Sequence, residues 1–160
     1  MIEIVFLADY PEAIPTLTRW FVAQWPEYYA EQPLAEIAED FRSDANRSGL
    51  PVRLLAFADG ELAGTIILRE EATWHSPEYQ PGLGGLLVAE QYRRQGIGTE
   101  LVKAGMKLAQ AQGYQRVYAT TVAARGILER LGWQLFQVVW HDDEQLDLYQ
   151  YEFAESQQEP

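Results

Sequence analysis

Residues 82–113 read GLGGLLVAEQYRRQGIGTELVKAGMKLAQAQG, and this stretch decides the fold. Leu83–Val88 is a short apolar run with the length of a buried strand. Ala89–Gly98 is a turn that carries two arginines and two glycines. From Ile97 onward, apolar residues recur at helical spacing until Gly113, and a glycine is typical of a helix C-terminus. The stretch therefore predicts a strand, a basic glycine-containing turn and a helix in direct succession.

The turn in this stretch has the chemistry of an anion site. The first amides of a helix have no intrahelical partner and carry the positive end of the helix dipole. Gly96 and Gly98 leave the backbone open to a bulky anion, and Arg93 and Arg94 add positive charge. A phosphate or pyrophosphate suits such a turn, although a plain loop before a helix shares the short pattern. A P-loop is excluded because no Gly-Lys-Ser/Thr follows, and Leu101 replaces the third glycine of a dinucleotide-binding fold.

Composition narrows the class of protein. A length of 160 residues is enough for one domain, which we expect over residues 1–153, followed by a flexible tail over 154–160. The absence of cysteine excludes disulfides and a cysteine nucleophile, and His75 and His141 have no companions at metal-ligand spacing. We therefore expect no metal. The net charge of −12 argues against nucleic-acid binding, and an acidic surface attracts cations such as amines, although solubility alone explains most of these charges.

The N-terminal residues and the hydropathy of the chain bear on its location. The first residues, MIEIVFLADY, include the acidic Glu3 and no basic segment, so we interpret them as a first strand and not as a signal peptide. No apolar run approaches membrane-spanning length. Together with the absence of cysteine, these features lead us to expect a cytoplasmic protein without a membrane partner.

Periodicity and turn residues predict the order of the remaining elements. Helices are expected up to about residue 25, from 33 to about 48 and over 123–131, and strands over 2–8, 52–58, 62–69, 115–121, 133–140 and 146–153. Asp59-Gly60 is typical of a hairpin turn, and the proline-rich segment 70–82 is expected to be a loop. Hairpins require antiparallel pairs, whereas a strand–helix–strand unit requires a parallel pair. The sequence thus predicts an α/β fold with a mostly antiparallel seven-stranded sheet, a central parallel pair and helices on both faces.

Two motifs resemble those of a known family. The turn Arg93-Arg94-Gln95-Gly96-Ile97-Gly98 is similar to the Gln/Arg-x-x-Gly-x-Gly/Ala signature of the GNAT superfamily of N-acetyltransferases. The preceding Leu-Leu-Val-Ala-Glu resembles the fourth strand of that family, and Ile127–Trp133 resembles its closing Tyr-Glu-Lys-Leu-Gly-Phe element. The resemblance covers nearly the whole chain and implies a GNAT-like fold whose central parallel strands splay apart.

The resemblance also implies a cosubstrate, acetyl-CoA. Its pyrophosphate would lie on the amides of the turn, and its pantetheine arm would run beside the preceding strand. A backbone N–H, which maps to Val88, would polarise the thioester carbonyl. The residues implied at this site are Leu86, Leu87, Val88, Arg93, Arg94, Gln95, Gly96, Ile97, Gly98, Thr99 and Thr121.

An acceptor amine must lose a proton before it attacks, so the reaction requires a general base. Glu70 and Glu71 follow an expected strand, where family members often have a carboxylate. His75 and Tyr118 are further candidates. A solvated pair of carboxylates at a strand end explains the two glutamates equally well.

The chain departs from the family pattern at two positions. Leu128 occupies the place of a tyrosine that protonates the leaving thiolate, and Thr121 replaces an asparagine that binds pantetheine. A leucine has no proton to donate, so solvent, Tyr118 or Tyr149 would have to supply it.

We therefore expect an N-acetyltransferase that transfers the acetyl group directly to a primary amine, since no nucleophile for a covalent intermediate is available. The acceptor is left open between a small-molecule amine and a peptide. Leu128 motivates an alternative, an acyl-CoA-binding or sensing module with weak or no transferase activity, and an interaction protein that retains only the fold is a third possibility. The face of the last strand with Tyr149, Tyr151 and Phe153 either forms a homodimer surface or covers the core.

Overall fold

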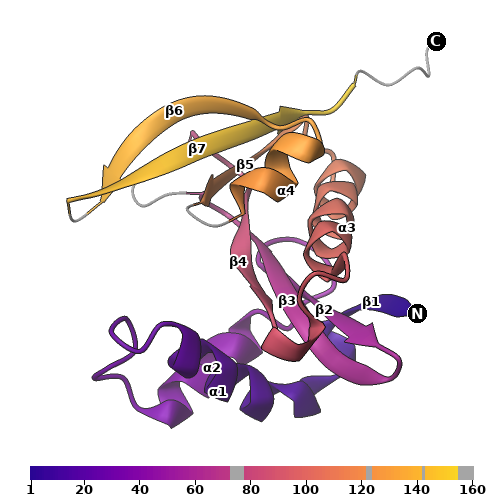
Figure 1. Ribbon diagram of the computed structural model, residues 1–160, viewed down its shortest axis with the longest axis vertical. Coiled ribbons are helices and arrows are strands. Elements are labelled where there is room, and N and C mark those ends of the chain that lie inside the picture. Colours follow the sequence, from indigo (N-terminus) through magenta and orange to yellow (C-terminus); the bar gives the residue numbers. More distant parts are fainter. Residues whose placement is uncertain (73–77, 122–123, 142, 155–160) are drawn as a thin grey trace. The chain divides into compact units, whose positions relative to one another are not determined.

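The computed structural model describes residues 1–72, 78–121, 124–141 and 143–154. Within these residues, the helices are α1 (Ile14–Gln24), α2 (Leu34–Ser43), α3 (Ile97–Ala111) and α4 (Arg125–Arg130). The strands are β1 (Ile2–Phe6), β2 (Val52–Ala58), β3 (Glu61–Arg69), β4 (Gly82–Val88), β5 (Arg116–Thr121), β6 (Gln134–His141) and β7 (Glu144–Glu152) (Figure 1). No helix in the described residues is long and apolar enough to cross a membrane.

The strands form one seven-stranded sheet in the order β1-β2-β3-β4-β5-β7-β6. β4 and β5 are parallel, with Gly82 opposite Tyr118. β1 pairs with β2, β5 with β7, and β6 with β7, all in antiparallel fashion. The predicted α/β fold, a mostly antiparallel seven-stranded sheet with one parallel pair, is confirmed.

The chain divides into two compact parts. The N-terminal part comprises Met1–Ile67 and Gly85–Leu101, and the C-terminal part comprises Leu68–Gly84 and the described residues from Val102 onward. The turn that the sequence singled out lies wholly in the N-terminal part, whereas the candidate bases lie in the C-terminal part.

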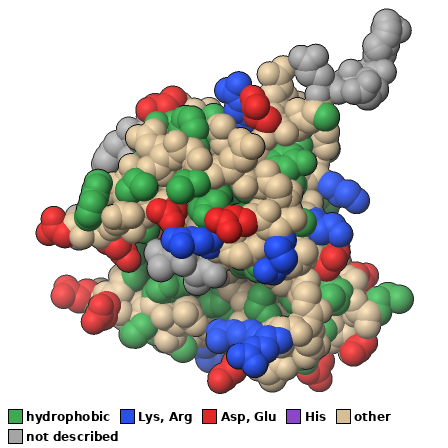
Figure 2. Space-filling model, turned by 45° about the horizontal axis from the view of Figure 1, so that its top comes forward, with side chains coloured by type: hydrophobic (Ala, Val, Ile, Leu, Met, Phe, Trp, Pro, Cys, Tyr) green, Lys and Arg blue, Asp and Glu red, His purple; other side chains and the backbone are tan. Residues whose placement is uncertain are grey.

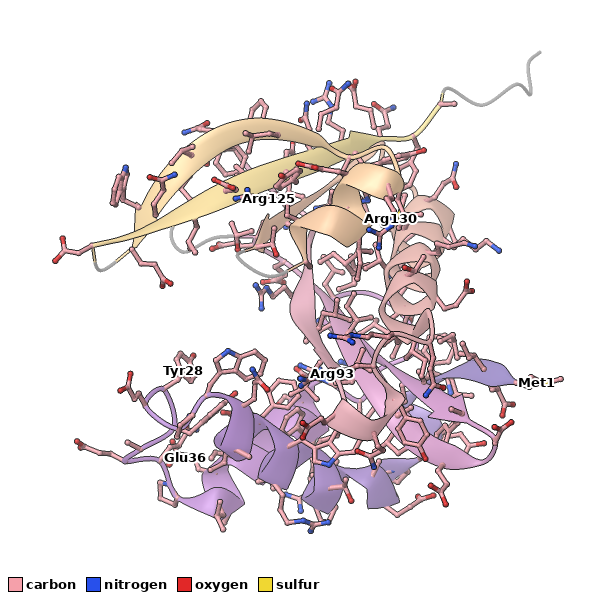
Figure 3. All side chains as sticks on the ribbon, viewed as in Figure 1. Met1, Tyr28, Glu36, Arg93, Arg125 and Arg130 are labelled. Atoms are coloured by element: carbon pink, nitrogen blue, oxygen red, sulfur yellow. The ribbon has the colours of Figure 1, made fainter. Side chains whose placement is uncertain are left out.

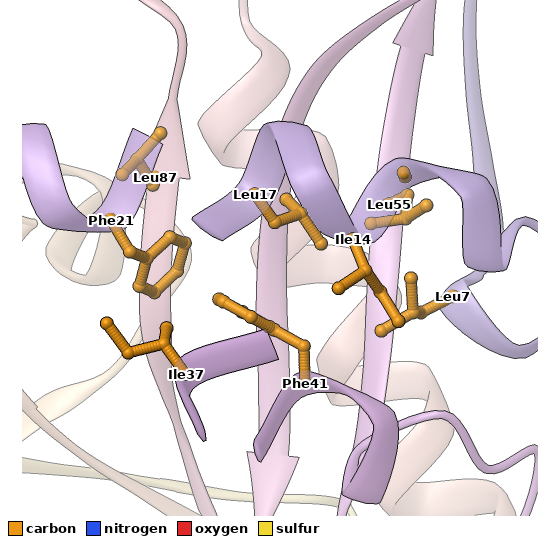
Figure 4. Close-up of a cluster of buried hydrophobic side chains, with 9 residues drawn as sticks. Leu7, Ile14, Leu17, Phe21, Ile37, Phe41, Leu55 and Leu87 are labelled. Carbon is orange, nitrogen blue, oxygen red and sulfur yellow. The ribbon is translucent and has the colours of Figure 1, made fainter. Parts of the chain in front are cut away.

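The apolar faces of two helices form a buried cluster in the N-terminal part. α1 buries Ile14, Leu17 and Phe21 at spacings of three and four residues, and α2 buries Ile37 and Phe41 in the same way. The rings of Phe21 and Phe41 meet edge to face with centroids 5.0 Å apart. The sequence pattern predicted both apolar faces. Figure 4 shows the cluster that they form with residues of the strands and the first turn, Leu7, Leu55 and Leu87.

The aromatic residues around the link between α1 and α2 divide between core and surface. Trp20 and Tyr29 pack against the buried cluster. Trp25 and Tyr28 are 39% and 72% exposed. Burial raises the pKa of Tyr29, and the neighbouring Tyr28 raises it further.

α2 ends five residues earlier than the periodicity predicts. The predicted helix runs to about residue 48, but the last helical residue is Ser43. The side-chain amide of Asn46 donates to the carbonyl oxygens of Ser43 and Pro51 at 2.9 and 2.8 Å. An asparagine side chain that bonds to local backbone competes with the helix for the same carbonyls, and this explains the early end.

Other boundaries differ by one to three residues. β1 ends at Phe6 because Leu7–Asp9 forms a 3₁₀ turn, closed by the Tyr10 N–H donating to the Leu7 carbonyl oxygen at 2.9 Å. Trp133 lies before β6, not on it. Its backbone N–H donates to the Leu128 carbonyl oxygen at 3.0 Å and so belongs to the end of α4.

The C-terminal part contains a curved antiparallel sheet of β5, β7 and β6, in which β6 and β7 form a long hairpin (Figure 1). Tyr149 on β7 is 1% exposed. Tyr151 contacts Trp133 and Phe153, with ring centroids 6.1 and 5.5 Å apart. These contacts support the interpretation that this face of the last strand covers the core.

Two glycines allow close packing in the C-terminal part. A side chain at Gly82 would place its Cβ 2.5 Å from the Cα of Ala72, a distance that no real contact allows. A Cβ at Gly105 on α3 would lie 2.4 Å from a methyl carbon of Leu83, so the helix packs directly on the start of β4. Acidic side chains, by contrast, are dispersed over several parts of the face shown in Figure 2, as expected of solvated charges.

Candidate functional site

The turn between β4 and α3 has an open backbone at its centre. After Val88 the chain forms a 3₁₀ turn over Glu90–Tyr92, and α3 begins at Ile97. Arg94 and Gly96 have positive φ angles of 66° and 83°. A Cβ at Gly96 would have no heavy atom within 4 Å, so this position faces open space. The predicted strand, turn and helix are confirmed.

Six consecutive amides of this turn are unsatisfied. The N–H of Arg93 donates to the Glu90 carbonyl oxygen, and that of Glu100 donates to the Gly96 carbonyl oxygen. Between them, the amides of Arg94 to Thr99 donate to no acceptor within the described part of the chain. Buried or half-buried amides normally have partners, so a run of six calls for water or an anionic ligand. The dipole of the 15-residue helix α3 favours the anion.

Arg93 does not point freely into solvent, because it is tied to the end of β4 (Figure 3). Its Nε donates to the carbonyl oxygen of Val88 at 2.9 Å. Arg94, Gln95 and Gly96 are exposed, whereas Ile97 is 1% exposed and anchors the first turn of α3. Gly98 and Thr99 are half-buried. The arginine therefore braces the turn against the strand and adds positive charge beside the open amides.

The end of β4 presents its backbone to two sides. The N–H of Ala89 donates to the Ala63 carbonyl oxygen on β3 at 2.8 Å. Successive amides of an extended chain point to opposite edges, so the N–H of Val88 is directed away from β3. Leu87 is buried in the core cluster, and Leu86 is half-buried. The amide of Val88 therefore lies on the edge of this segment that faces away from β3.

β3 approaches this segment closely because Gly64 has no side chain. A Cβ at Gly64 would lie 2.9 Å from the carbonyl oxygen of Leu87 and 3.1 Å from a methyl carbon of Leu101. The end of β4 and the first turn of α3 therefore rest on the same glycine of β3. This packing holds the strand and the open amides in one rigid unit.

The candidate bases lie in the C-terminal part, where β3 ends. Glu70 is exposed and Glu71 is half-buried. The Nε of Arg69 donates to the backbone carbonyl oxygen of Glu71 at 3.1 Å, and the next residue, Ala72, is anchored by its N–H to the Tyr79 carbonyl oxygen at 3.0 Å. The backbone of this pair of glutamates is fixed while the Glu70 side chain keeps its access to water. His75, the third candidate, lies outside the described residues.

Tyr118 is 7% exposed and belongs to a cluster of rings with Tyr79 and Phe136, at centroid distances of 5.5 and 6.2 Å. It stands opposite the first residue of β4, whereas Val88 is the last residue of that strand. The Nε of Arg116 donates a hydrogen bond to a carboxylate oxygen of Glu152, and this bond raises the pKa of Arg116; the Tyr118 side chain raises it further.

Leu128 and Thr121, the two residues that depart from the family pattern, both lie in packed surroundings. Leu128 is 2% exposed. The hydroxyl oxygen of Thr121 accepts from the N–H of Ala124 at 2.7 Å and so helps to begin α4. The hydroxyl of Tyr149 donates to a carboxylate oxygen of Glu129 at 2.7 Å. Burial, followed by this hydrogen bond, raises the pKa of Tyr149.

One buried charge was missed by the sequence analysis. Arg53 on β2 is 5% exposed and pairs with Asp44, which follows the end of α2. The only signal in the sequence was an arginine within the otherwise apolar run VRLLAFA. A long charged side chain in a strand more often reaches solvent at an edge, so the pattern alone did not single it out.

Metal-ligating side chains and grooves are the other features of the described residues that bear on ligand binding. They contain no group of three or more His, Cys, Asp and Glu side chains that could hold a metal ion. A groove of about 630 Å³ runs between α1 and α2 and is lined by residues such as Pro15, Thr18, Leu34 and Ala38. None of the predicted site residues lines this groove.

Comparisons with known proteins identify the family and the fold of the chain. The model of the acetyltransferase (GNAT) family matches residues 14–133. No curated protein sequence matches the chain. Among solved structures, an N-acetyltransferase from Staphylococcus aureus Mu50 is similar with a TM-score of 0.76 at 15% identity, covering 95% of this chain and 98% of that one.

Two other similar structures were solved with the coenzyme. An aminoglycoside 6'-N-acetyltransferase complexed with coenzyme A has a TM-score of 0.72 at 18% identity, covering 95% of this chain and 96% of that chain. An acetyltransferase structure from Salmonella typhimurium with its cofactor acetyl-CoA has a TM-score of 0.75 at 13% identity, with coverages of 97% and 95%. At such low identity these likenesses establish a shared fold.

Proposed function

The chain belongs to the acetyltransferase (GNAT) family, and on this premise we propose that it transfers an acetyl group from acetyl-CoA directly to a primary amine. The six open amides between Arg94 and Thr99 are the observation that carries this proposal. The strands of both compact parts belong to a single sheet, so we infer that residues 1–153 act as one catalytic domain. Acetyl-CoA supplies the acetyl group as an activated thioester.

The pyrophosphate of the coenzyme fits the turn. Backbone amides and a helix N-terminus are ready-made partners for phosphate oxygens, and the space beside Gly96 admits a bulky group. Arg93 and Arg94 supply positive charge in a chain whose net charge is −12. Without such local charge, an acidic protein would repel the coenzyme. Two structural neighbours solved with coenzyme A or acetyl-CoA support this assignment.

The N–H of Val88 is assigned to the thioester carbonyl. It is directed away from β3, and its own carbonyl oxygen is already bonded to Arg93. A rigid backbone donor stabilises the negative charge that develops on a carbonyl oxygen during acyl transfer. Leu86 and Leu87 continue the same segment and flank the pantetheine arm, and Thr121 offers it a hydroxyl.

Proton transfer is assigned to side chains of the C-terminal part. Glu70 accepts the proton of the acceptor ammonium, directly or through water, because it is exposed on a fixed backbone segment; Glu71 is the second choice. Tyr118 and Tyr149 are both buried, so neither is a ready donor to the leaving thiolate. We therefore infer that solvent protonates the thiolate.

We propose a cationic small molecule or a peptide amine as the acceptor. The net charge of −12 and the exposed rings of Trp25 and Tyr28 favour an amine that carries positive charge. A similar fold serves an aminoglycoside 6'-N-acetyltransferase, which is consistent with this class.

The test is a screen for release of free thiol from acetyl-CoA. The panel contains a polyamine, an aminoglycoside, a free amino acid and a peptide with an unblocked N-terminus. We expect turnover with at least one amine and a loss of that turnover in Glu70→Gln. Binding of acetyl-CoA without turnover on any amine would favour the alternative, a module that binds or senses acyl-CoA. Failure to bind acetyl-CoA at all would refute the proposed function.

A further inference from the structure

Arg53 is the central residue of a buried polar network in the N-terminal part. Its Nε lies 3.2 Å from a carboxylate oxygen of Asp44, and the two side chains are 6% and 17% exposed. The backbone N–H of Arg53 also donates to the Asp44 carbonyl oxygen at 3.1 Å. Burying such a pair costs desolvation free energy, and well-packed apolar residues of similar volume often give equal or greater stability. The presence of the pair therefore calls for a role other than stability.

The guanidinium of Arg53 is held in a single orientation. Its carbon lies 5.2 Å from the ring centroid of Phe21 and 5.0 Å from that of Phe41. Its Nη1 donates to the hydroxyl oxygen of Thr65 at 3.1 Å, and that hydroxyl donates to the Leu54 carbonyl oxygen at 2.8 Å. Two rings, a hydroxyl and a carboxylate thus fix its plane. A lysine ammonium has no plane that could be fixed in this way.

This oriented guanidinium lies beside the one left-handed residue of β4. Gly85 has a φ of 58°, so the backbone departs from the extended conformation at this point within the strand. A Cβ at Gly85 would lie 3.5 Å from Nη2 and 3.8 Å from Nη1 of Arg53, and 3.2 Å from a methyl carbon of Ile67. The conformation at Gly85 sets the direction of the three residues that follow, which end at Val88.

We propose that Arg53 is a positioning residue for acetyl transfer: it holds the chain at Gly85 so that the N–H of Val88 is aimed at the thioester carbonyl. The inference rests on the proposed function, because it presumes that the Val88 amide meets the acetyl group. The network also ties β4 to α1 through Phe21 and to α2 through Phe41.

The test compares the affinities for acetyl-CoA and for CoA, since only acetyl-CoA has the thioester carbonyl. Dissociation constants of both are measured by calorimetry for the wild type, Arg53→Lys and Asp44→Asn. Arg42→Met is the matched control, because Arg42 forms an exposed ion pair with Glu39 on the same part of the chain. Thermal unfolding of each variant confirms that it is folded.

We expect Arg53→Lys to lower the preference for acetyl-CoA over CoA by about threefold to tenfold, the worth of one hydrogen bond, with CoA affinity almost unchanged. Asp44→Asn should act in the same direction, and it serves as the decisive variant if Arg53→Lys does not fold. Arg42→Met should leave the preference as in the wild type. Equal weakening of both ligands, or an unchanged preference, would show a purely structural role and overturn the inference. A wild type that binds neither ligand would refute the proposed function as well.

Discussion

Gly96 offers the sharpest test of the proposed coenzyme site. The substitution Gly96→Glu places a carboxylate where the pyrophosphate is expected, and no protein atom lies within 4 Å of the new Cβ. The backbone is left-handed at this position, with φ of 83°, so any side chain costs about 1–2 kcal/mol of stability. Gly96→Ala has the same backbone cost without the charge. The two variants therefore separate strain from electrostatic repulsion.

The magnitude follows from Coulomb's law. Two unit charges about 6 Å apart at an effective dielectric constant of about 20 repel by about 2.8 kcal/mol, which weakens binding about 100-fold. At about 100 times the dissociation constant, acetyl-CoA stabilises the wild type by about 2.7 kcal/mol, and the same concentration stabilises Gly96→Glu by only about 0.4 kcal/mol. For a chain of this length these values correspond to Tm increases of about 5–11 °C and about 1–2 °C.

The assay is thermal unfolding with and without acetyl-CoA at fixed ionic strength. Gly113→Glu is the matched control, because Gly113 also has a positive φ, of 93°, and open space around its Cβ, but lies beyond the other end of α3. We expect the wild type, Gly96→Ala and Gly113→Glu to keep the full Tm increase. An equal increase in Gly96→Glu would refute the placement of the pyrophosphate at this turn, and no increase in any variant would refute coenzyme binding.

Three further outcomes follow from the structure. Gly82→Ala should destabilise the fold by about 3 kcal/mol or more in denaturant unfolding, because its Cβ would lie 2.5 Å from a backbone carbon. The control Gly126→Ala on α4 should be neutral or stabilising, because the only atom near its Cβ belongs to the flexible end of an arginine side chain. Because the pKa of Tyr149 is raised in the folded protein, its contribution to stability is complete below about pH 10 and is lost as the pH rises through the folded pKa. The free energy of unfolding of Tyr149→Phe, measured against pH, should therefore lack this alkaline loss. A parallel loss in both proteins would contradict the burial argument. With an amine found in the screen, Glu70→Gln should lower kcat about 100-fold or more near neutral pH, and an unchanged rate together with a slow Glu71→Gln would transfer the role of base to the second glutamate.

Much of the fold was predictable because its signals are local. The spacing of Ile14, Leu17 and Phe21 predicted an amphipathic helix, and Asp59-Gly60 predicted the hairpin between β2 and β3. The turn with Arg93 and Gly96 predicted the start of a helix directly after a strand. Each of these features depends on residues a few positions apart, so the sequence pattern contains them completely.

The features that the sequence did not predict depend on side chains that contact residues distant in the sequence, or on side chains that compete with the helix for backbone hydrogen bonds. The end of α2 at Ser43 depends on the side chain of Asn46, which bonds to the backbone in place of the next helical turn. The orientation of Arg53 depends on Asp44 and Thr65, which come from two different elements. No periodicity encodes such contacts, since they exist only after the elements have packed.

The sequence by itself determined the family of this chain, its mixed sheet and the glycine turn, because helix and strand periods and the conformational freedom of glycine are properties of short segments. Only the tertiary structure decided which groups have partners. It left six amides open from Arg94 to Thr99, turned Arg93 back onto Val88, and buried Arg53 beside Gly85. Hydrogen bonding and burial depend on atoms that packing brings together, and the order of residues along the chain does not specify them.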